Sequence, residues 1–130
     1  MTIFGAIGMA GTGMTVTRKW MDAISDNLAN ASTVTSTSEE AFRTRYVVAQ
    51  EMADGGVQVA GVALGAAEGR LVHEPDHPLA DADGYVRYPD VDMASQMTQL
   101  IMAQRGYQAN AAVVSRATES YQAALQIGRS

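Results

Sequence analysis

Residues 93–127 read MASQMTQLIMAQRGYQANAAVVSRATESYQAALQI, and the spacing of their apolar side chains determines the architecture. This run predicts a helix of about 36 residues, about 54 Å long. Asp92 is placed to cap its N-terminus, and Gly128 with Arg129 to end it. Steps of four and three residues place the following side chains on an a/d coiled-coil seam: Met93, Met97, Leu100, Gln104, Tyr107, Ala111, Val114, Thr118, Tyr121 and Leu125.

A second heptad run lies near the N-terminus and predicts a helix over roughly residues 4–31, about 40 Å long. Four glycines dilute its first turns, and each costs about 1 kcal/mol relative to alanine. We therefore expect this end to be ordered only when a partner covers it. Its seam consists of Ile7, Ala10, Met14, Thr17, Met21, Ile24, Leu28 and Ala31.

The two seams most simply face each other in an antiparallel coiled-coil hairpin. The opposite faces of the helices are not strongly polar, and a helix that is apolar on more than one face needs more than one partner. We therefore expect the helices to pack against other subunits as well. The apolar residues of the second helix that lie off its seam are Ile101, Met102, Ala109, Val113 and Ala117.

Residues 32–91 have the pattern of strands and loops. Alternating or β-rich runs predict short strands at 46–50, 57–64, 70–73 and 85–88, with a turn at 54–56 and an ordered polar loop at 74–84. So small a sheet needs the helices for its stability. We predict an α+β fold in which residues 1–31 and 92–130 form a helical domain and residues 32–91 a small β and loop segment.

Composition excludes several classes of protein. The chain has 130 residues, no cysteine and a net charge of -5, which argues against disulfides, iron–sulfur clusters and general nucleic-acid binding. The charge of -7 in residues 32–92 contrasts with 0 in residues 1–31 and +2 in residues 93–130. No uncharged apolar run is long enough for membrane insertion. The first charges, Arg18 and Lys19, follow the apolar start, the reverse of a Sec signal.

One stretch resembles a metal site. His73, Glu74 and His77 match the H-E-x-x-H pattern of zinc hydrolases, which needs both histidines on one helical face. Pro75 lies between them and disfavours a helix, so we interpret the stretch as a loop pinned by proline. We expect no enzyme activity, no catalytic or metal-binding residues and no cofactor; the zinc hydrolase remains the alternative from another class.

Four blocks carry a resemblance to a known family: ISDNLANA at 24–31, EPDHPLAD with GYV at 74–81 and 84–86, YPDVD with QM at 88–92 and 96–97, and AQRGYQAN with ALQIGR at 103–110 and 124–129. With these blocks the chain resembles the flagellar axial proteins, most closely those of the proximal rod. Asp90 and Asp92 stand where the family usually has Asn, and Gln96 where it usually has Glu.

The resemblance implies a structural subunit that polymerises through its terminal helices and transmits torque from the motor ring to the hook. It further implies export by the flagellar type III apparatus and a place in the basal body, within the cell envelope. The implied partners are other copies of the chain, other rod proteins and the motor-ring and export junction. Another rod or hook-junction component is the alternative within the class, and a monomeric helical-hairpin binding module a third possibility.

The residues expected at the assembly interface come from both helices. Asn27 and Asn30 either cap and fold back the end of the first helix or hydrogen-bond across subunits, and the second interpretation is preferred. The full set is Met14, Met21, Ile24, Asn27, Leu28, Asn30, Leu100, Tyr107, Asn110, Val114, Tyr121 and Leu125.

Overall fold

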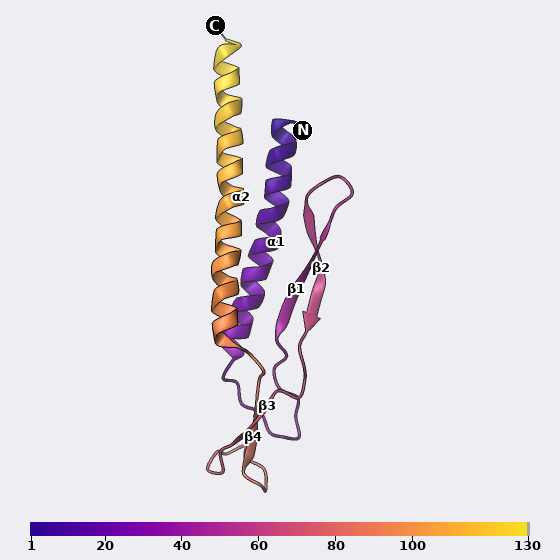
Figure 1. Ribbon diagram of the computed structural model, residues 1–130, viewed down its shortest axis with the longest axis vertical. Coiled ribbons are helices and arrows are strands. Elements are labelled where there is room, and N and C mark those ends of the chain that lie inside the picture. The colour runs from indigo at the N-terminus through magenta and orange to yellow at the C-terminus, as the bar shows by residue number, and fades with distance from the viewer. Residues whose placement is uncertain (130) are drawn as a thin grey trace.

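The structure is a computed structural model that describes residues 1–129. Two long antiparallel helices, α1 (Ile3–Asn30) and α2 (Met93–Ile127), lie side by side and give the molecule its elongated shape (Figure 1). The segment between them forms two small antiparallel sheets. The predicted α+β class and the paired terminal helices are confirmed.

Each of the two helices begins with a side-chain cap, and an aromatic contact shows how the helices are aligned with each other. The Thr2 hydroxyl accepts from the Gly5 N–H at 3.0 Å, and the Asp92 carboxylate accepts from the Ala94 and Ser95 N–H groups. Near the N-terminus of α1, the Phe4 and Tyr121 rings meet edge to face, 5.2 Å apart. Because Tyr121 lies opposite the first turn of α1, the last turns of α2 extend beyond its partner (Figure 1).

The side of α2 that faces α1 agrees with the predicted seam at every second position. At the positions between, the residue that faces α1 is the one immediately before the predicted residue. Gln96 is 3% exposed and Ala103 is fully buried, whereas Met97 is 53% exposed. The heptad reading favoured the apolar side chain over its polar neighbour. In the structure Gln96 turns inward because it has a hydrogen-bond partner on α1, and Ala103 is small enough to allow close approach of the helices.

The hairpin of β1 (Arg45–Glu51) and β2 (Val57–Leu64) packs on the side of α1 away from α2 (Figure 1). The strands are antiparallel, with a bulge between Val48 and Ala49. The Thr12 hydroxyl of α1 donates to the Met9 carbonyl at 2.7 Å and accepts from the Val57 N–H at 3.1 Å, which fixes the hairpin to the helix.

The second sheet consists of β3 (Arg70–His73) and β4 (Tyr85–Tyr88) and lies at the lower end of the molecule (Figure 1). Thr35 pairs with Arg87 through two backbone hydrogen bonds, of 2.9 and 3.0 Å, and adds one residue to the free edge of β4. Gly69 precedes β3 with a φ of 59°, in the left-handed region that favours glycine.

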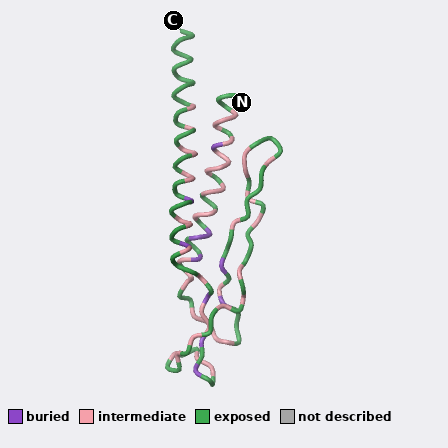
Figure 2. The backbone as a smooth tube through the Cα atoms, viewed as in Figure 1, coloured by how far each residue is buried: buried purple, intermediate pink, exposed green. Residues whose placement is uncertain are grey.

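The buried core is small, and Figure 2 shows it as short buried stretches on the helices, in the loops and at the lower end of the molecule, where β4 lies. The surface area is 8462 Å², whereas a compact monomer of this mass exposes about 6,600 Å². Within residues 1–129, no helix is both long and apolar enough to cross a membrane. The buried apolar residues are Ala10, Ala23, Ile24, Ala41, Val86 and Ala103.

Candidate assembly surface

Asn27 joins three elements inside the subunit. Its side chain is 1% exposed; Nδ2 donates to the Arg45 carbonyl of β1 and to Gln96 Oε1 of α2, both at 2.9 Å. Its Oδ1 accepts from the Arg45 N–H at 2.8 Å. These bonds give the Asn27 side chain a role inside the subunit. The interpretation that Asn27 hydrogen-bonds to a neighbouring subunit stays a prediction.

Asn30 belongs to the end of α1. Its Nδ2 donates to the Asp26 carbonyl at 2.9 Å, and its Oδ1 accepts from the Thr33 hydroxyl at 3.3 Å. These bonds link the last turn of the helix to the chain that leaves it. They match the first interpretation, in which this residue folds back the helix end.

Most other predicted interface residues line the pairing of α1 with α2. Met14 and Tyr107 border the same groove between the helices, and the Asn110 side chain lies directly against Gly13. Tyr121 and Leu125, near the free end of α2, are more exposed. The residues at or near the helix pair, buried or partly buried, are Met14, Met21, Ile24, Leu28, Leu100, Tyr107, Asn110 and Val114.

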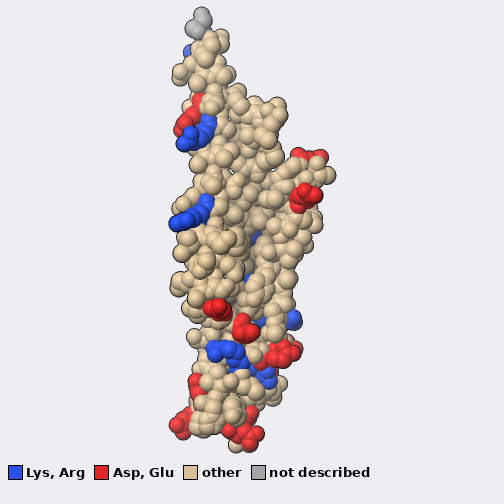
Figure 3. Space-filling view, in the orientation of Figure 1, with Lys and Arg blue, Asp and Glu red and all other residues tan. Residues whose placement is uncertain are grey.

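A different part of α2 is open to a neighbour. The side of this helix away from α1, here called the outer α2 face, exposes large apolar side chains, among them Ile101 at 52%. The three charged side chains of α2, Arg105, Arg116 and Glu119, are also exposed, and Arg105 and Arg116 lie one helical turn from Met102 and Val113. Figure 3 shows most acidic side chains of that view at the lower end of the molecule. The exposed apolar residues of the outer α2 face are Met97, Ile101, Met102 and Val113.

Part of this face could be predicted from the sequence, because the apolar residues Ile101, Met102 and Val113 lie off the heptad seam. Met93 and Met97 were instead assigned to the pairing of the two helices. The one-residue difference in the seam moves Met97 to the outer α2 face. Met93 shares its heptad position with Leu100 and Tyr107 and is exposed as the first residue of α2.

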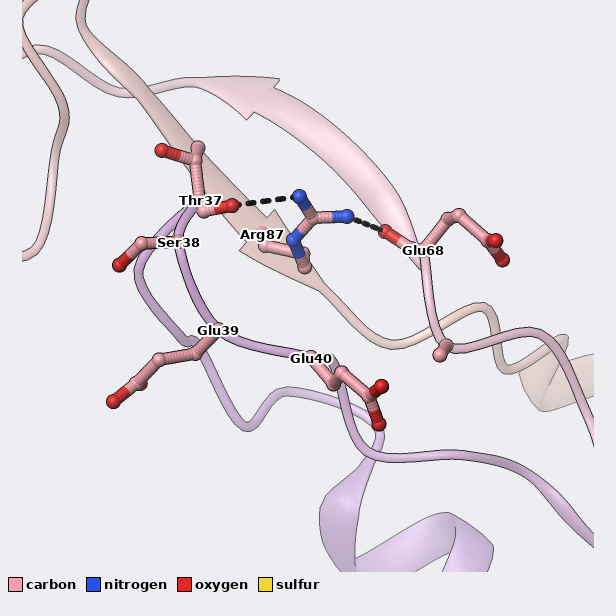
Figure 4. A pocket seen from close by; sticks show the side chains of 7 residues that line it. Thr37, Ser38, Glu39, Glu40, Glu68 and Arg87 are labelled. Carbon is pink, nitrogen blue, oxygen red and sulfur yellow. Dashed lines mark hydrogen bonds between the residues drawn. The ribbon is translucent and has the colours of Figure 1, made fainter.

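Hydrogen bonds donated by the Arg87 side chain hold the lower end of the molecule together (Figure 4). Its guanidinium donates to the Thr37 carbonyl at 2.8 Å and to the Glu68 carbonyl, beside a cavity of about 240 Å³. The guanidinium therefore ties the loop after α1 to the loop before β3. Because both of these side-chain hydrogen bonds go to backbone carbonyls, Arg87 has a structural role.

Asp81 closes the loop between β3 and β4. Its carboxylate accepts from the N–H groups of Tyr85 and Asp83, at 2.9 and 3.0 Å, and from the Thr37 hydroxyl at 2.9 Å. These donors, the Tyr85 N–H foremost, hold the pKa of the Asp81 carboxyl below its usual value. The charged form of Asp81 therefore stabilises this loop.

The H-E-x-x-H stretch does not form a zinc-peptidase site. His73 ends β3, and His77 lies in the turn that follows, so the two imidazoles share no helical face. Glu74 Oε1 accepts from the Tyr88 hydroxyl at 3.1 Å, and this bond raises the pKa of Tyr88. The part of the chain that the structure describes, residues 1–129, holds no group of three or more His, Asp or Glu residues suited to a metal ion.

Two long paired terminal helices with a small β segment between them in the sequence define the fold that the comparisons with known proteins address. A family model described as flagellar basal body rod FlgEFG protein C-terminal matches residues 82–127, which include β4 and α2. Together with the full-length relatives given next, this match defines the chain as a rod protein of the bacterial flagellar basal body.

The relatives make the assignment more specific. The flagellar basal-body rod protein FlgC of Salmonella typhimurium is 36% identical, over 99% of this chain and 100% of the relative. The FlgC proteins of Borreliella burgdorferi and Bacillus subtilis are each 28% identical, over 98% and 99% of the chain and 98% and 100% of their own lengths. The chain belongs to the FlgC family, as the sequence blocks predicted, and its place is the flagellar basal body.

Proposed function

We propose that the chain is a structural subunit of the proximal part of the flagellar rod. It polymerises through its terminal helices with copies of itself and with other rod proteins, and it connects the rod to the motor-ring and export junction. In this role it transmits torque towards the hook and performs no catalysis.

The observation that carries this proposal is the apolar surface that the folded chain leaves uncovered. Its surface area exceeds that of a compact monomer of the same mass by about 1,800 Å². Stable protein interfaces bury about 1,200–2,000 Å² in total. The excess surface area is therefore as large as the area that contacts with neighbouring subunits would bury. The outer α2 face supplies the most apolar part of this surface.

The shape of the subunit suits a filament under torsion. α2 has 35 residues, and its outer face presents apolar side chains over several turns, so a neighbour can pack against it along an extended line. Contacts between different faces of successive copies build a helical polymer when the rotation between copies does not close a ring. Extended packing of this kind resists sliding better than a contact at one point.

A pair of matched substitutions tests the proposal. Met97→Asp places a charge on the outer α2 face, and Leu79→Asp places one in the loop between β3 and β4, at side chains that are 53% and 44% exposed. A carboxylate buried in an interface without a partner costs about 3–5 kcal/mol. We expect Met97→Asp to abolish rods in electron micrographs of basal bodies, whereas Leu79→Asp retains them.

Both variants are first purified and compared with the native chain by circular dichroism, so that loss of the fold is not mistaken for loss of assembly. Normal rods and swimming in cells that carry only the Met97→Asp chain would contradict the proposal. The native position of the subunit in labelled basal bodies separates the proximal rod from the alternative of another rod or hook-junction position.

A further inference from the structure

A second open surface lies on the other side of α1, between this helix and β2. This α1–β2 groove has a volume of about 340 Å³, and its exposed lining is predominantly apolar. Since a cavity of about 150 Å³ holds a benzene molecule, this groove has room for two side chains of leucine size. Its lining includes Thr12, Thr15, Val16, Lys19, Val57 and Val59.

The same chain has an apolar end that lacks support from α1. Tyr121 contacts Phe4 at the first turn of α1, so residues 122–127 of α2 extend past the helix pair. Leu125 in this overhang is 49% exposed. Most helical stability in proteins comes from packing, so a neighbour that covers Leu125 would stabilise this end of α2.

The overhang cannot reach the groove of its own subunit. Asn110 lies against Gly13, and Leu125 is fifteen residues further along α2, which is about 23 Å at 1.5 Å per residue. Thr15 lies a further two residues from Gly13 in the opposite direction. Leu125 and Thr15 of one chain are therefore separated by about 25 Å.

We propose that the α1–β2 groove receives the C-terminal overhang of α2 from a second copy of this chain, displaced by about 25 Å along the long axis. This inference rests on the proposed function, because it specifies one contact within the polymer. Leu125 of one copy then lies at the level of Thr15 and Val16 of the next.

Charge supports this register. With Leu125 beside Thr15, Glu119 is six residues nearer the lower end and falls at the level of Met21, within one helical turn of Lys19 in the second copy. Lys19 lines the groove, and the one ion pair among residues 1–129 joins Arg45 to Asp26 instead. The contact thus brings a lysine and a glutamate of opposite charge to the rim of an apolar groove.

Disulfide trapping in assembled rods tests the contact, because the native chain has no cysteine. A Thr15→Cys and Leu125→Cys double variant is expressed in cells that lack the native chain. Disulfides need Cα atoms less than about 7 Å apart, so a bond between these positions can form only between copies. We expect oxidation of isolated basal bodies to give dimers and longer ladders on non-reducing gels.

The control is a Leu79→Cys and Leu125→Cys variant, which pairs the overhang with an exposed leucine of the loop between β3 and β4 and should give no ladder. Cells that swim but yield no ladder from the Thr15 and Leu125 pair would overturn the inference and leave the proposed function standing. Trapping of a different rod protein alone, without ladders of this chain, would also overturn it.

A charge exchange covers the case in which the double cysteine variant does not assemble. Lys19→Glu is expected to reduce swimming, and Lys19→Glu combined with Glu119→Lys to restore it, because opposite charges face each other again. If the combination swims no better than Lys19→Glu alone, the proposed register is wrong.

Discussion

Replacing Asn27 with alanine removes three hydrogen bonds that join α1, β1 and α2. The variant leaves the Gln96 amide, which is buried, without its partner on α1, and it leaves the N–H and carbonyl of Arg45 without the side chain that bonds both. A buried polar group left unsatisfied costs about 1–3 kcal/mol, and each remaining bond contributes about 0.5–1.5 kcal/mol. We expect the free energy of unfolding to fall by about 3 kcal/mol, a large fraction of the usual 5–15 kcal/mol.

Urea denaturation of the purified chain, followed by circular dichroism, measures this loss. Asn30→Ala is the matched control, because Asn30 is partly exposed and bonds only near its own helix end, and it should cost less than about 1 kcal/mol. Adding Gln96→Leu to Asn27→Ala should recover part of the loss, since no amide then remains unpaired. Equal midpoints for Asn27→Ala and Asn30→Ala would refute the role assigned to Asn27.

Three further predictions concern backbone, packing and charge. Gly69→Ala should unfold the lower end, seen as proteolysis near residue 69, because a Cβ there would lie 2.1 Å from the Tyr88 carbonyl oxygen; native-like protease resistance would contradict this. Gly11→Ala should stabilise the chain to thermal unfolding by about 1 kcal/mol, whereas Gly13→Ala should gain less, since its Cβ would lie 2.8 Å from the Asn110 amide; equal gains would be inconsistent with the helix register. Because the folded state lowers the pKa of Asp81 below 3.8, its stabilising contribution should be present above pH 3.8 and be lost as the pH falls through the lower, folded value. Asp81→Asn removes the titrating carboxyl, so the free energy of unfolding should depend less on pH in this acid range. An unchanged pH dependence would argue against Asp81 as its cause.

Much of the fold could be predicted because its signals are local. The heptad runs and the cap at Asp92 located both helices to within a residue or two of the observed Ile3–Asn30 and Met93–Ile127. Alternation of side chains and the glycines at 55 and 56 located β1 and β2. These features depend on neighbours along the chain and need no knowledge of distant contacts.

The contact faces could not be predicted in the same way. The seam of α2 includes Gln96 because Asn27, 69 residues away in the chain, donates to it. Apolar spacing alone favoured Met97, which the structure leaves exposed. The packing of the β1–β2 hairpin on α1, and the bonds from Arg87 to the loops around it, likewise depend on long-range pairing that no periodic pattern records.

The central claim is that this chain is a structural part of the rod, and electron microscopy of basal bodies from a strain lacking it tests that claim most directly. We predict rings without a rod and loss of swimming, with both restored by the native gene. Intact rods and normal swimming in the deletion strain would contradict the account.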